Sequence, residues 1–401
     1  ESKGHYVCGT DISDTTIQNI KNKKIGYKEI WVDDYLKNTK LDVFDVAGVV
    51  KNSDIIFVPI QTPHEEKYEG VTRIPEERAD FNYKYLIDGM KQLSDEIEKN
   101  GDNKIVIIIS TVLPGTIRKE IKPFLSNKIQ LCYNPFFIAM GSTMRDFLHP
   151  EFVLFGVDDL GAYKVCKEFY KTITKAPLYE TTIENAELIK VSYNTLISTK
   201  IAFSNTIMEL CHKLPNTNVD EVTNALKLAN RRLISGYYMD GGMGDGGGCH
   251  PRDNIAMSYL SDKLNISHNW FEHIMQQREK QTEWLVELII SNSKNLKVNI
   301  LGKSFKAESN LTLGSPAILL QNILEEKNIE SNIWDPIIDQ KFEEYSKKYS
   351  WDTKAQLFFV ATKHEEFNKF PFFPGSVVID PWRYISVKED IKLIRVGDSK
   401  K

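Results

Sequence analysis

The residues best suited to covalent chemistry lie in a glycine-rich loop that carries one cysteine. The loop reads GGMGDGGGCHPRD from Gly241 to Asp253. Pro251 predicts that a helix begins beside Cys249, and a helix N-terminus stabilises a thiolate, as the nearby cationic Arg252 also would. Asp253 is close enough in sequence to take a proton from the thiol or from a water. We predict that Cys249 is a nucleophile, although a flexible turn with an incidental cysteine has the same pattern.

Lys190 and Asn194 form a second candidate group because their spacing puts them on one helix face. They lie four residues apart in the segment ENAELIKVSYN. A cation beside an amide supplies hydrogen-bond donors for an oxyanion, whereas a solvated polar stripe would have the same spacing. The presence of Cys249 in the same chain favours the oxyanion interpretation.

An alternation of strands and helices must position part of this chemistry. Between Tyr6 and about Gly156, short β-rich apolar runs alternate with polar, helix-like segments. This pattern predicts a parallel sheet with helices on both faces. Asp11 ends the first run, where dinucleotide-binding folds place an acidic residue that binds the adenosine ribose. The apolar runs are YVCGTDI, DIIFVPI, KIVIIIST, QLCYNP and FVLFGV.

Such folds also need a glycine-rich turn before the acidic residue, and none precedes Asp11. A GxGxxG match occurs at Gly242, Gly244 and Gly247. It follows no predicted strand, so we interpret it as unrelated to cofactor binding. We therefore expect further residues, including the missing turn, upstream of Glu1.

Helical segments and a second α/β alternation follow. The pattern predicts a long helix from Glu184 to about Leu214. A helix of this length can join two domains and form a dimer seam, so we expect a homodimer or a higher homo-oligomer. Strands and helices alternate again after about Leu296. We predict an α/β protein with domains at residues 1–183, 184–295 and 296–401.

Composition and charge exclude several classes of function. Of 401 residues, 41% are hydrophobic and 26% are charged, as in soluble globular proteins. A net charge of -4 gives no broad basic field for nucleic acid. No apolar run approaches the roughly 20 residues that cross a bilayer, so we expect no membrane role. The five cysteines lack CxxC spacing, which indicates a reducing compartment, most simply the cytoplasm, and we expect no metal ion in the chemistry.

Motifs along nearly the whole chain occur in a recognisable order. GTDIS begins at Gly9, PIQTP at Pro59 and STVLPGT at Ser110. The lysine–asparagine helix and the cysteine loop follow, and then LGKSFK at Leu301 and a turn at Asp335. In this order they resemble the UDP-glucose/GDP-mannose dehydrogenase family. The resemblance implies an N-terminal Rossmann-like NAD-binding domain, a central all-helical domain with one long helix, and a C-terminal Rossmann-like domain that binds the nucleotide sugar.

The same resemblance implies a four-electron oxidation of a nucleotide sugar by two molecules of NAD. UDP-sugars are favoured, and conversion of UDP-glucose to UDP-glucuronate is the commonest activity in the family. Cys249 would capture the aldehyde as a thiohemiacetal, a second oxidation would give a thioester, and water would release the acid. Lys190 and Asn194 would stabilise the oxyanion. Asp253 would act as base, and Thr111 would position the water.

Binding residues are also implied by the resemblance, and each has an ordinary structural alternative. Asp11 could equally cap a strand end, and Lys306 could be a surface lysine beside Phe305. The NAD contacts would be Asp11, Thr62 and Thr111. The substrate contacts would be Tyr238, Gly246, Gly247, Lys306 and Arg232.

Some positions depart from the family pattern, in addition to the missing glycine turn. Phe136 and Met140 stand where glutamates are expected. Leu313 stands where an arginine is expected ahead of a Ser-Pro pair, and Arg231 or Arg232 could replace that contact. These departures bear on how the water is activated and on which sugar fits.

Two other functions fit parts of the sequence. A two-electron β-hydroxyacid dehydrogenase also places a lysine and an asparagine on one face of a long helix, but it needs no cysteine. A catalytically silent relative would bind a nucleotide sugar, or serve as a scaffold, without oxidising it, which Phe136, Met140 and Leu313 would explain. Retention of Cys249 together with the polar groups argues against a silent relative.

Overall fold

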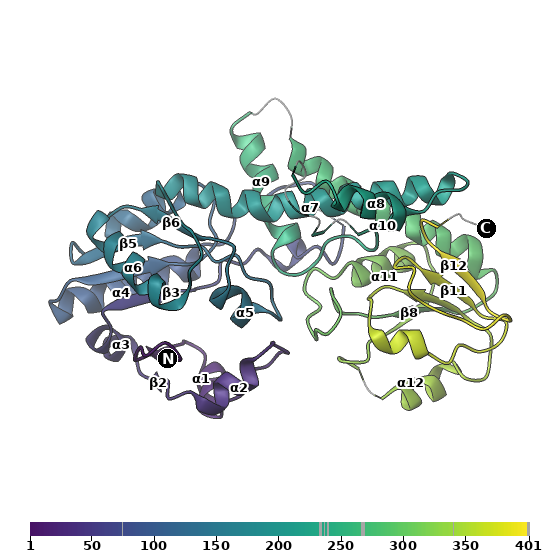
Figure 1. Ribbon diagram of the computed structural model, residues 1–401, viewed down its shortest axis with the longest axis horizontal. Helices are drawn as coiled ribbons and strands as arrows, with labels where there is room; N and C mark the ends of the chain where they lie inside the picture. Colours follow the sequence, from purple (N-terminus) through teal and green to yellow (C-terminus); the bar gives the residue numbers. More distant parts are fainter. Residues whose placement is uncertain are drawn as a thin grey trace. The chain divides into compact units, whose positions relative to one another are not determined.

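Figure 1 shows the computed structural model, which describes residues 1–73, 75–231, 235, 237–238, 240–265, 269–339 and 341–398. The chain forms two compact units. Unit 1 contains Glu1–Pro63 and Asp80–Tyr193, and unit 2 contains His64–Ala79 and Asn194–Lys401. Both units combine helices with parallel strands, so the predicted α/β class is confirmed. The finer division into domains at residues 183 and 295 stays a prediction.

Unit 1 is built around a five-stranded sheet in the order β3-β4-β5-β6-β7. Its pairs are parallel except that β6 runs antiparallel to β5, where the prediction of a parallel sheet was wrong. The helix between these two strands, α5 (Thr143–Leu148), has six residues. It rises only about 9 Å, so this connection lacks the long crossover helix that usually joins parallel strands. The strands are β3 (Ile55–Val58), β4 (Lys104–Ile108), β5 (Ile129–Tyr133), β6 (Val153–Val157) and β7 (Leu178–Thr181).

Helices cover both faces of this sheet, as predicted. All residues of β4 are buried, as expected for a strand covered on both sides. Val106 and Ile108 pack in one apolar cluster with α4 (Lys84–Asn100), while Ile105 and Ile107 pack in another with α6 (Leu160–Ile173). The alternation of strand side chains therefore divides β4 between two helical layers.

Two short strands of unit 1 form a separate sheet. β1 (Cys8–Gly9) pairs in parallel with β2 (Asp42–Val43), so only two residues of the predicted strand at Tyr6–Ile12 are paired. Two of the three flanking helices begin at side-chain caps, which satisfy otherwise unpaired N–H groups: Ser13 caps the first helix and Asp45 the third. These helices are α1 (Asp14–Lys21), α2 (Val32–Asn38) and α3 (Val46–Asn52).

Unit 2 contains a second five-stranded sheet, in which every pair is parallel. Its order is β12-β11-β10-β8-β9. β8, β10 and β11 are buried along their whole length, which explains their nearly continuous apolar sequences. The strands are β8 (Val298–Leu301), β9 (Ser331–Trp334), β10 (Leu357–Val360), β11 (Val377–Asp380) and β12 (Lys392–Arg395). Helices between them are α11 (Pro316–Glu326) and α12 (Phe342–Tyr349).

The long helix and the other predicted helices are confirmed, with shifted ends. α7 (Ile183–Lys213) has 31 residues, close to the predicted range. Asn218 caps α8 (Val219–Lys227), and Asn269 caps α10 (Trp270–Ser293). α9 (His250–Lys263) begins directly after the glycine loop, beside Cys249 as predicted. Single-turn helices are η1 (Glu66–Tyr68), η2 (Ile117–Ile121), η3 (Lys122–Phe124) and η4 (Glu365–Lys369).

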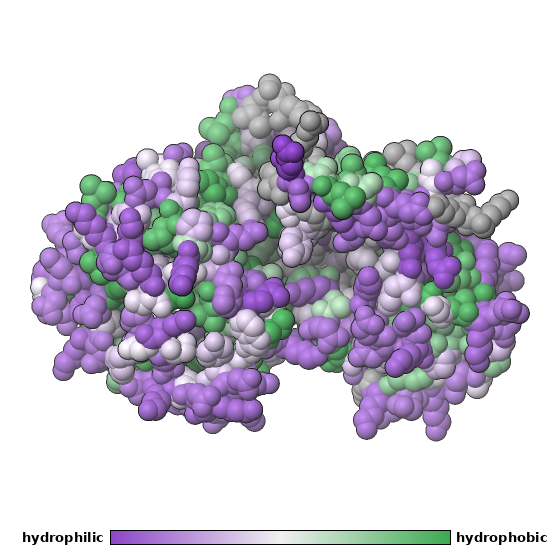
Figure 2. All heavy atoms as spheres, viewed as in Figure 1, coloured by the Kyte–Doolittle hydropathy of each residue, from purple (hydrophilic) through white to green (hydrophobic). Residues whose placement is uncertain are grey.

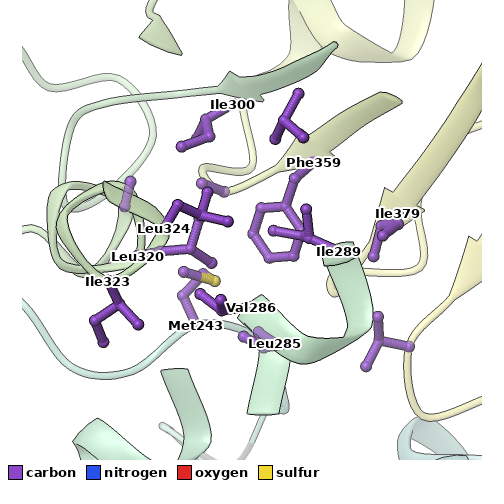
Figure 3. Packing of buried hydrophobic residues seen from close by; sticks show 14 of the residues in the cluster. Met243, Leu285, Val286, Ile289, Ile300, Leu320, Ile323, Leu324, Phe359 and Ile379 are labelled. Atoms are coloured by element: carbon purple, nitrogen blue, oxygen red, sulfur yellow. The ribbon is translucent and has the colours of Figure 1, made fainter. Parts of the chain in front are cut away.

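One core cluster of unit 2 lies between its sheet and two helices (Figure 3). Leu285 of α10 and Leu320 of α11 pack in the same cluster as Ile300, Phe359 and Ile379 of the sheet. Full burial of one such side chain contributes about 1.5–3 kcal/mol. Met243 also belongs to this cluster, so the core includes a residue of the glycine loop itself. The loop is therefore fixed to the fold by apolar contact.

Hydrophilic residues cover most of the face drawn in Figure 2, and hydrophobic residues lie between them in scattered groups. None of the helices in the described ranges is both long enough and apolar enough to span a bilayer.

Shortening a buried side chain of this core tests how well the core is packed. We expect Leu320→Ala to lower the free energy of unfolding of unit 2 by about 2–5 kcal/mol, because it leaves a cavity at a fully buried site. Leu264, which is 62% exposed, provides a matched control, and Leu264→Ala should cost less than about 1 kcal/mol. Guanidinium unfolding followed by tryptophan fluorescence is suitable, because all tryptophans except Trp31 lie in unit 2. Equal losses of unfolding free energy in the two variants would contradict the buried packing of Leu320.

Candidate active site

The residues predicted to contact NAD all follow strands of unit 1. Asp11 lies after β1, Thr62 after β3 and Thr111 after β4, at the carboxyl ends where open α/β sheets bind dinucleotides. Thr62 is buried, and its hydroxyl donates a hydrogen bond of 2.6 Å to the carbonyl of Thr111. Asp11 is exposed, and its Oδ1 accepts from the amide of Ser13 at 2.8 Å. An exposed carboxylate and two threonines at strand ends fit the ribose hydroxyls and the ring of a dinucleotide.

Glu187 fixes the loop that follows Thr111. Its side chain is fully buried, and its two oxygens accept from the amides of Gly115 at 2.5 Å and Ile117 at 2.9 Å. Burial raises the pKa of Glu187 to about 7, against the opposing effect of these amide donors and of Arg118. The carboxyl group thus ties the loop after β4 to α7, the helix that carries Lys190. Nothing in the sequence predicted a role for Glu187.

Lys190 is buried in unit 1, where a backbone carbonyl and an aromatic ring contact its ammonium group. Nζ donates to the carbonyl of Phe136 at 2.8 Å and lies 5.1 Å from the ring centroid of Phe137. Only 6% of the residue is exposed, so a solvated polar stripe does not describe it. A hydrogen bond and a cation–π contact hold the charge in a low-dielectric setting, where it acts strongly on a nearby anion.

The segment that departs from the family pattern contributes backbone as well as side chains. Phe136, in place of an expected glutamate, supplies the carbonyl that accepts from Lys190, and its ring packs 5.2 Å from that of Phe147. Met140 is 37% exposed. The apolar substitution at Phe136 is therefore absorbed by an aromatic cluster.

Asn194 and Asp253 are brought together within unit 2. The amide nitrogen of Asn194 donates to Asp253 Oδ2 at 2.6 Å, and Arg252 Nε lies 3.1 Å from Asp253 Oδ1. Asp253 is fully buried and Asn194 nearly so. The amide thus orients the carboxylate, a contact that the sequence did not predict. Lys190 and Asn194 both lie in α7, as predicted.

Cys249 is the N-cap residue of α9. The helix begins at His250 and carries Pro251 in its first turn, so the predicted position of the cysteine at a helix N-terminus is confirmed. The carbonyl of Cys249 accepts from the amide of Asp253 at 2.8 Å, which places the carboxylate residue one turn into the same helix. The thiol group belongs to a partly exposed residue and forms no disulfide. A partly exposed cysteine at the start of a helix is accessible to an electrophile.

A buried ion pair anchors the loop that carries this cysteine. Arg278 of α10 and Asp245 are both nearly inaccessible, with Nε 2.8 Å from Oδ1. The guanidinium also donates to the carbonyls of Asp245, Gly70 and Gly314 at 3.2, 3.0 and 3.1 Å. Ser198 of α7 donates to the other carboxylate oxygen at 2.6 Å. One arginine therefore joins the glycine loop to two distant segments of unit 2.

The glycines of the loop are required by packing against the protein itself. A Cβ at Gly246 would lie 2.9 Å from Phe305 Cβ, and one at Gly242 would lie 2.1 Å from the ring of Trp382. Gly247 has a φ of 81°, which side chains disfavour, and faces the ring of Phe305. These positions are therefore glycines because Phe305 and Trp382 leave no room for a side chain.

The remaining residues that were predicted to contact the substrate differ in exposure and in their neighbours. Lys306 is half-buried, and its Nζ lies 5.6 Å from the centroid of Phe305, the ring that covers Gly247. Tyr238 is 45% exposed and has a φ of 61°. Leu313 is 40% exposed. Arg232 lies outside the described residues.

The predicted site residues are thus divided between the units, and several supporting residues were missed. Asp245 was the single charge within the run of glycines, a signal that could have marked it. Glu187 and Arg278 gave no sequence signal beyond their charge on a predicted helix. Unit 1 holds Asp11, Thr62, Thr111 and Lys190, and unit 2 holds Asn194, Tyr238, Gly246, Gly247, Cys249, Asp253 and Lys306.

Two family models match the chain and together cover about two thirds of it. Residues 1–174 match the NAD binding domain of the UDP-glucose/GDP-mannose dehydrogenase family. Residues 184–279 match the central domain of the same family. The predicted NAD contacts fall in the first range, and the lysine–asparagine helix and the cysteine loop fall in the second.

Individual relatives agree with these matches. A UDP-glucose 6-dehydrogenase of Rickettsia felis is 26% identical over 348 residues, covering 83% of this chain and 74% of the relative. A GDP-mannose 6-dehydrogenase of Pseudomonas aeruginosa is 26% identical over 347 residues, covering 83% of this chain and 76% of the relative. The structure of a UDP-glucose dehydrogenase from Pyrobaculum islandicum shares the fold, with a TM-score of 0.84 at 21% identity over 98% of this chain and 92% of that one.

The raised pKa of Glu187 predicts a pH-dependent stability. An acid whose pKa rises on folding, here from 4.5 to about 7, stabilises the protein fully below pH 4.5 and loses that contribution as pH rises through 7. Between pH 5 and pH 8, the unfolding free energy of the wild type relative to Glu187→Gln should fall, by at most ~3 kcal/mol. Denaturant titrations of both proteins followed by circular dichroism would measure this change.

Glu184 provides the control on the same helix. Its hydrogen bond to Arg118 lowers the pKa of its carboxyl group, so Glu184 stays ionised at both pH values. The difference between the wild type and Glu184→Gln should stay constant between pH 5 and pH 8. A constant difference for Glu187→Gln as well would show that its pKa is not raised.

Removal of the buried guanidinium group of Arg278 should lower the stability of unit 2. Arg278→Met leaves Asp245 as an unpaired buried charge, and we expect the free energy of unfolding of unit 2 to fall by about 3–5 kcal/mol. The double variant Arg278→Met with Asp245→Asn should recover part of this loss. Arg231→Met, at an exposed arginine, is the control and should change the free energy of unfolding by less than ~0.5 kcal/mol. Tryptophan fluorescence during guanidinium unfolding would measure all three. An Arg278→Met protein as stable as the wild type would refute the anchoring role.

Proposed function

Because the chain belongs to the UDP-glucose/GDP-mannose dehydrogenase family, we propose that it oxidises the primary alcohol of a nucleotide sugar to a carboxylate, with NAD as acceptor. The observation that carries this proposal is the first turn of α9. It presents Cys249 at the helix end and the buried Asp253, which Asn194 orients through a hydrogen bond of 2.6 Å. A nucleophile beside an oriented carboxylate is what the oxidation of an aldehyde through a thioester requires.

Bound NAD supplies the hydride acceptor, and two molecules are reduced for each acid formed. On the protein side, the exposed carboxylate of Asp11 would hold the adenosine ribose. Thr62 and Thr111, linked through their hydrogen bond after β3 and β4, would line the nicotinamide end. Glu187 would keep the Thr111 loop in place through its two amide contacts.

Cys249 would act after the first oxidation has converted the alcohol to an aldehyde. Its thiolate adds to the aldehyde carbon, and the resulting oxyanion takes a proton to give a thiohemiacetal. Loss of a second hydride and of the hydroxyl proton gives a thioester. Water then attacks the thioester, the carbon–sulfur bond breaks, and the acid leaves while the thiol is restored. The four electrons removed equal those accepted by two NAD molecules.

The polar residues would assist at the charged stages. Asp253 would accept the proton of the thiol or of the attacking water, and Thr111 would position that water. Lys190 and Asn194 would stabilise the oxyanion, the ammonium doing so from an apolar setting formed by Phe136 and Phe137. Gly246, Gly247, Tyr238, Lys306 and Arg232 would contact the nucleotide sugar.

We propose UDP-glucose as the substrate and UDP-glucuronate as the product. Relatives named UDP-glucose 6-dehydrogenase support this choice, and a relative named GDP-mannose 6-dehydrogenase makes GDP-mannose the main competitor. Phe136 and Leu313, which replace polar residues of the family pattern, would bear on sugar choice.

Substitution of the cysteine tests the mechanism directly. With Cys249→Ser, we expect acid formation from UDP-glucose to fall by about 10³-fold or more, because the hydroxyl is a far weaker nucleophile than a thiolate. Cys8→Ser, at a half-exposed cysteine of β1 outside the proposed site, should keep wild-type turnover. NADH absorbance measured together with product analysis should give two NADH per substrate for the wild type.

Other outcomes would point to the alternatives. Full turnover by Cys249→Ser with one NADH per substrate would establish a two-electron dehydrogenase. Absence of NADH formation across a panel of UDP- and GDP-sugars, with nucleotide-sugar binding detected by calorimetry, would establish a binding protein. Both outcomes would overturn the proposed oxidation.

A further inference from the structure

A cluster of ligand-type side chains lies at the carboxyl ends of neighbouring strands in unit 2. Glu308 follows β8, and His364 and Glu366 follow β10, which pairs with β8. A ring nitrogen of His364 and one carboxylate oxygen from each glutamate lie within 4.8 Å of one another. His364 is fully buried, whereas both glutamates are exposed. The cluster plays no part in the proposed oxidation and does not depend on it.

Hydrogen bonding fixes which nitrogen of His364 carries the proton. Nε2 lies 3.2 Å from Asp335 Oδ2 and 3.1 Å from Ser304 Oγ. The same carboxylate oxygen accepts from the amides of Lys303 and Ser304 and from the Ser304 hydroxyl. An oxygen with so many donors is an ionised acceptor, so Nε2 must be the protonated nitrogen. In the neutral imidazole, Nδ1 then keeps a lone pair.

Nδ1 has no hydrogen-bond partner among the described residues, although it is buried. An unpaired polar atom in the interior is costly, and such atoms in folded proteins call for a specific explanation. A cation would satisfy the lone pair, and two carboxylates stand close by to bind the same cation. A histidine whose other nitrogen donates to a buried carboxylate is also the usual arrangement of metal-binding histidines.

We propose that His364 Nδ1, Glu308 and Glu366 form a binding site for one divalent transition-metal ion of the Zn²⁺ type. An imidazole ligand favours such ions over Mg²⁺ and Ca²⁺, which prefer sites made of oxygen alone. Zinc–ligand bonds of about 2.0–2.2 Å bring ligand atoms roughly 3.4 Å apart. The exposed glutamate side chains would move inward to reach this spacing, while the buried imidazole stays fixed by Asp335 and Ser304.

The site would connect two loops at the end of the sheet. Glu308 belongs to the loop between β8 and α11, which also contains Lys306 and Leu313, and Glu366 belongs to η4 (Glu365–Lys369). A bound ion would therefore hold the loop that carries Lys306 against η4. Three protein ligands leave a coordination position for water.

Calorimetric titration of metal-free full-length protein with Zn²⁺ tests the proposal. The wild type should bind one equivalent more than the double variant Glu308→Gln with Glu366→Gln, and each single substitution should weaken this site at least ~10-fold. Both glutamates are exposed, so these variants should fold normally, which circular dichroism would verify. Glu365→Gln, on the same short helix but outside the cluster, should bind as the wild type does. Mg²⁺ at millimolar concentration should not compete.

Titration with Co²⁺ provides a second readout, because its visible absorption reports nitrogen and oxygen ligands and is distinct from that of thiolate ligands. Equal Zn²⁺ stoichiometry and affinity in the wild type and the double variant would mean that the ion binds elsewhere, for example at the cysteines. Absence of binding to the wild type would mean that His364 serves only to pair with Asp335. Either result would overturn the proposed site.

Discussion

The buried guanidinium of Arg278 is the contact on which the arrangement of unit 2 depends. Its donors reach the carbonyls of Asp245, Gly70 and Gly314, three loop positions with no shared secondary structure. Buried loop carbonyls need such donors, because no helix or strand partner is available to them. A buried ion pair by itself is weak evidence for stability, since desolvation opposes the attraction. Here its effect is geometric, because the pair fixes the path of the glycine loop.

That path determines where the chemistry can occur. The loop continues from Asp245 through Gly246 and Gly247, which press against Phe305, and places Cys249 at the N-cap position of α9. The same helix turn carries Asp253, whose carboxylate is oriented by Asn194. An anchored loop and a helix end together set the position of a thiol and a carboxylate, and the glycines make this possible by leaving room for the neighbouring rings.

In unit 1 as well, buried side chains hold backbone loops in place. Glu187 accepts from two amides of the loop after β4, and Lys190, one turn later in α7, is held by the carbonyl of Phe136. Charged side chains of one helix thus organise backbone segments that follow the strands. The apolar residue at position 136 does not disturb this arrangement, because its contact with Lys190 is made by the backbone.

The sequence by itself determined the α/β class, the long helix, the helix start beside Cys249 and the family, because periodicity, helix caps and motifs depend on residues close together in the chain. It did not determine that β6 runs antiparallel, that Asn194 holds Asp253, or that Arg278 and Glu187 anchor the loops. The cluster of His364 with two glutamates was equally invisible, since Glu308 is remote in sequence. Only the tertiary structure decided these contacts, because a hydrogen bond or an ion pair between distant residues depends on how the packed elements meet, and that meeting leaves no local pattern in the chain.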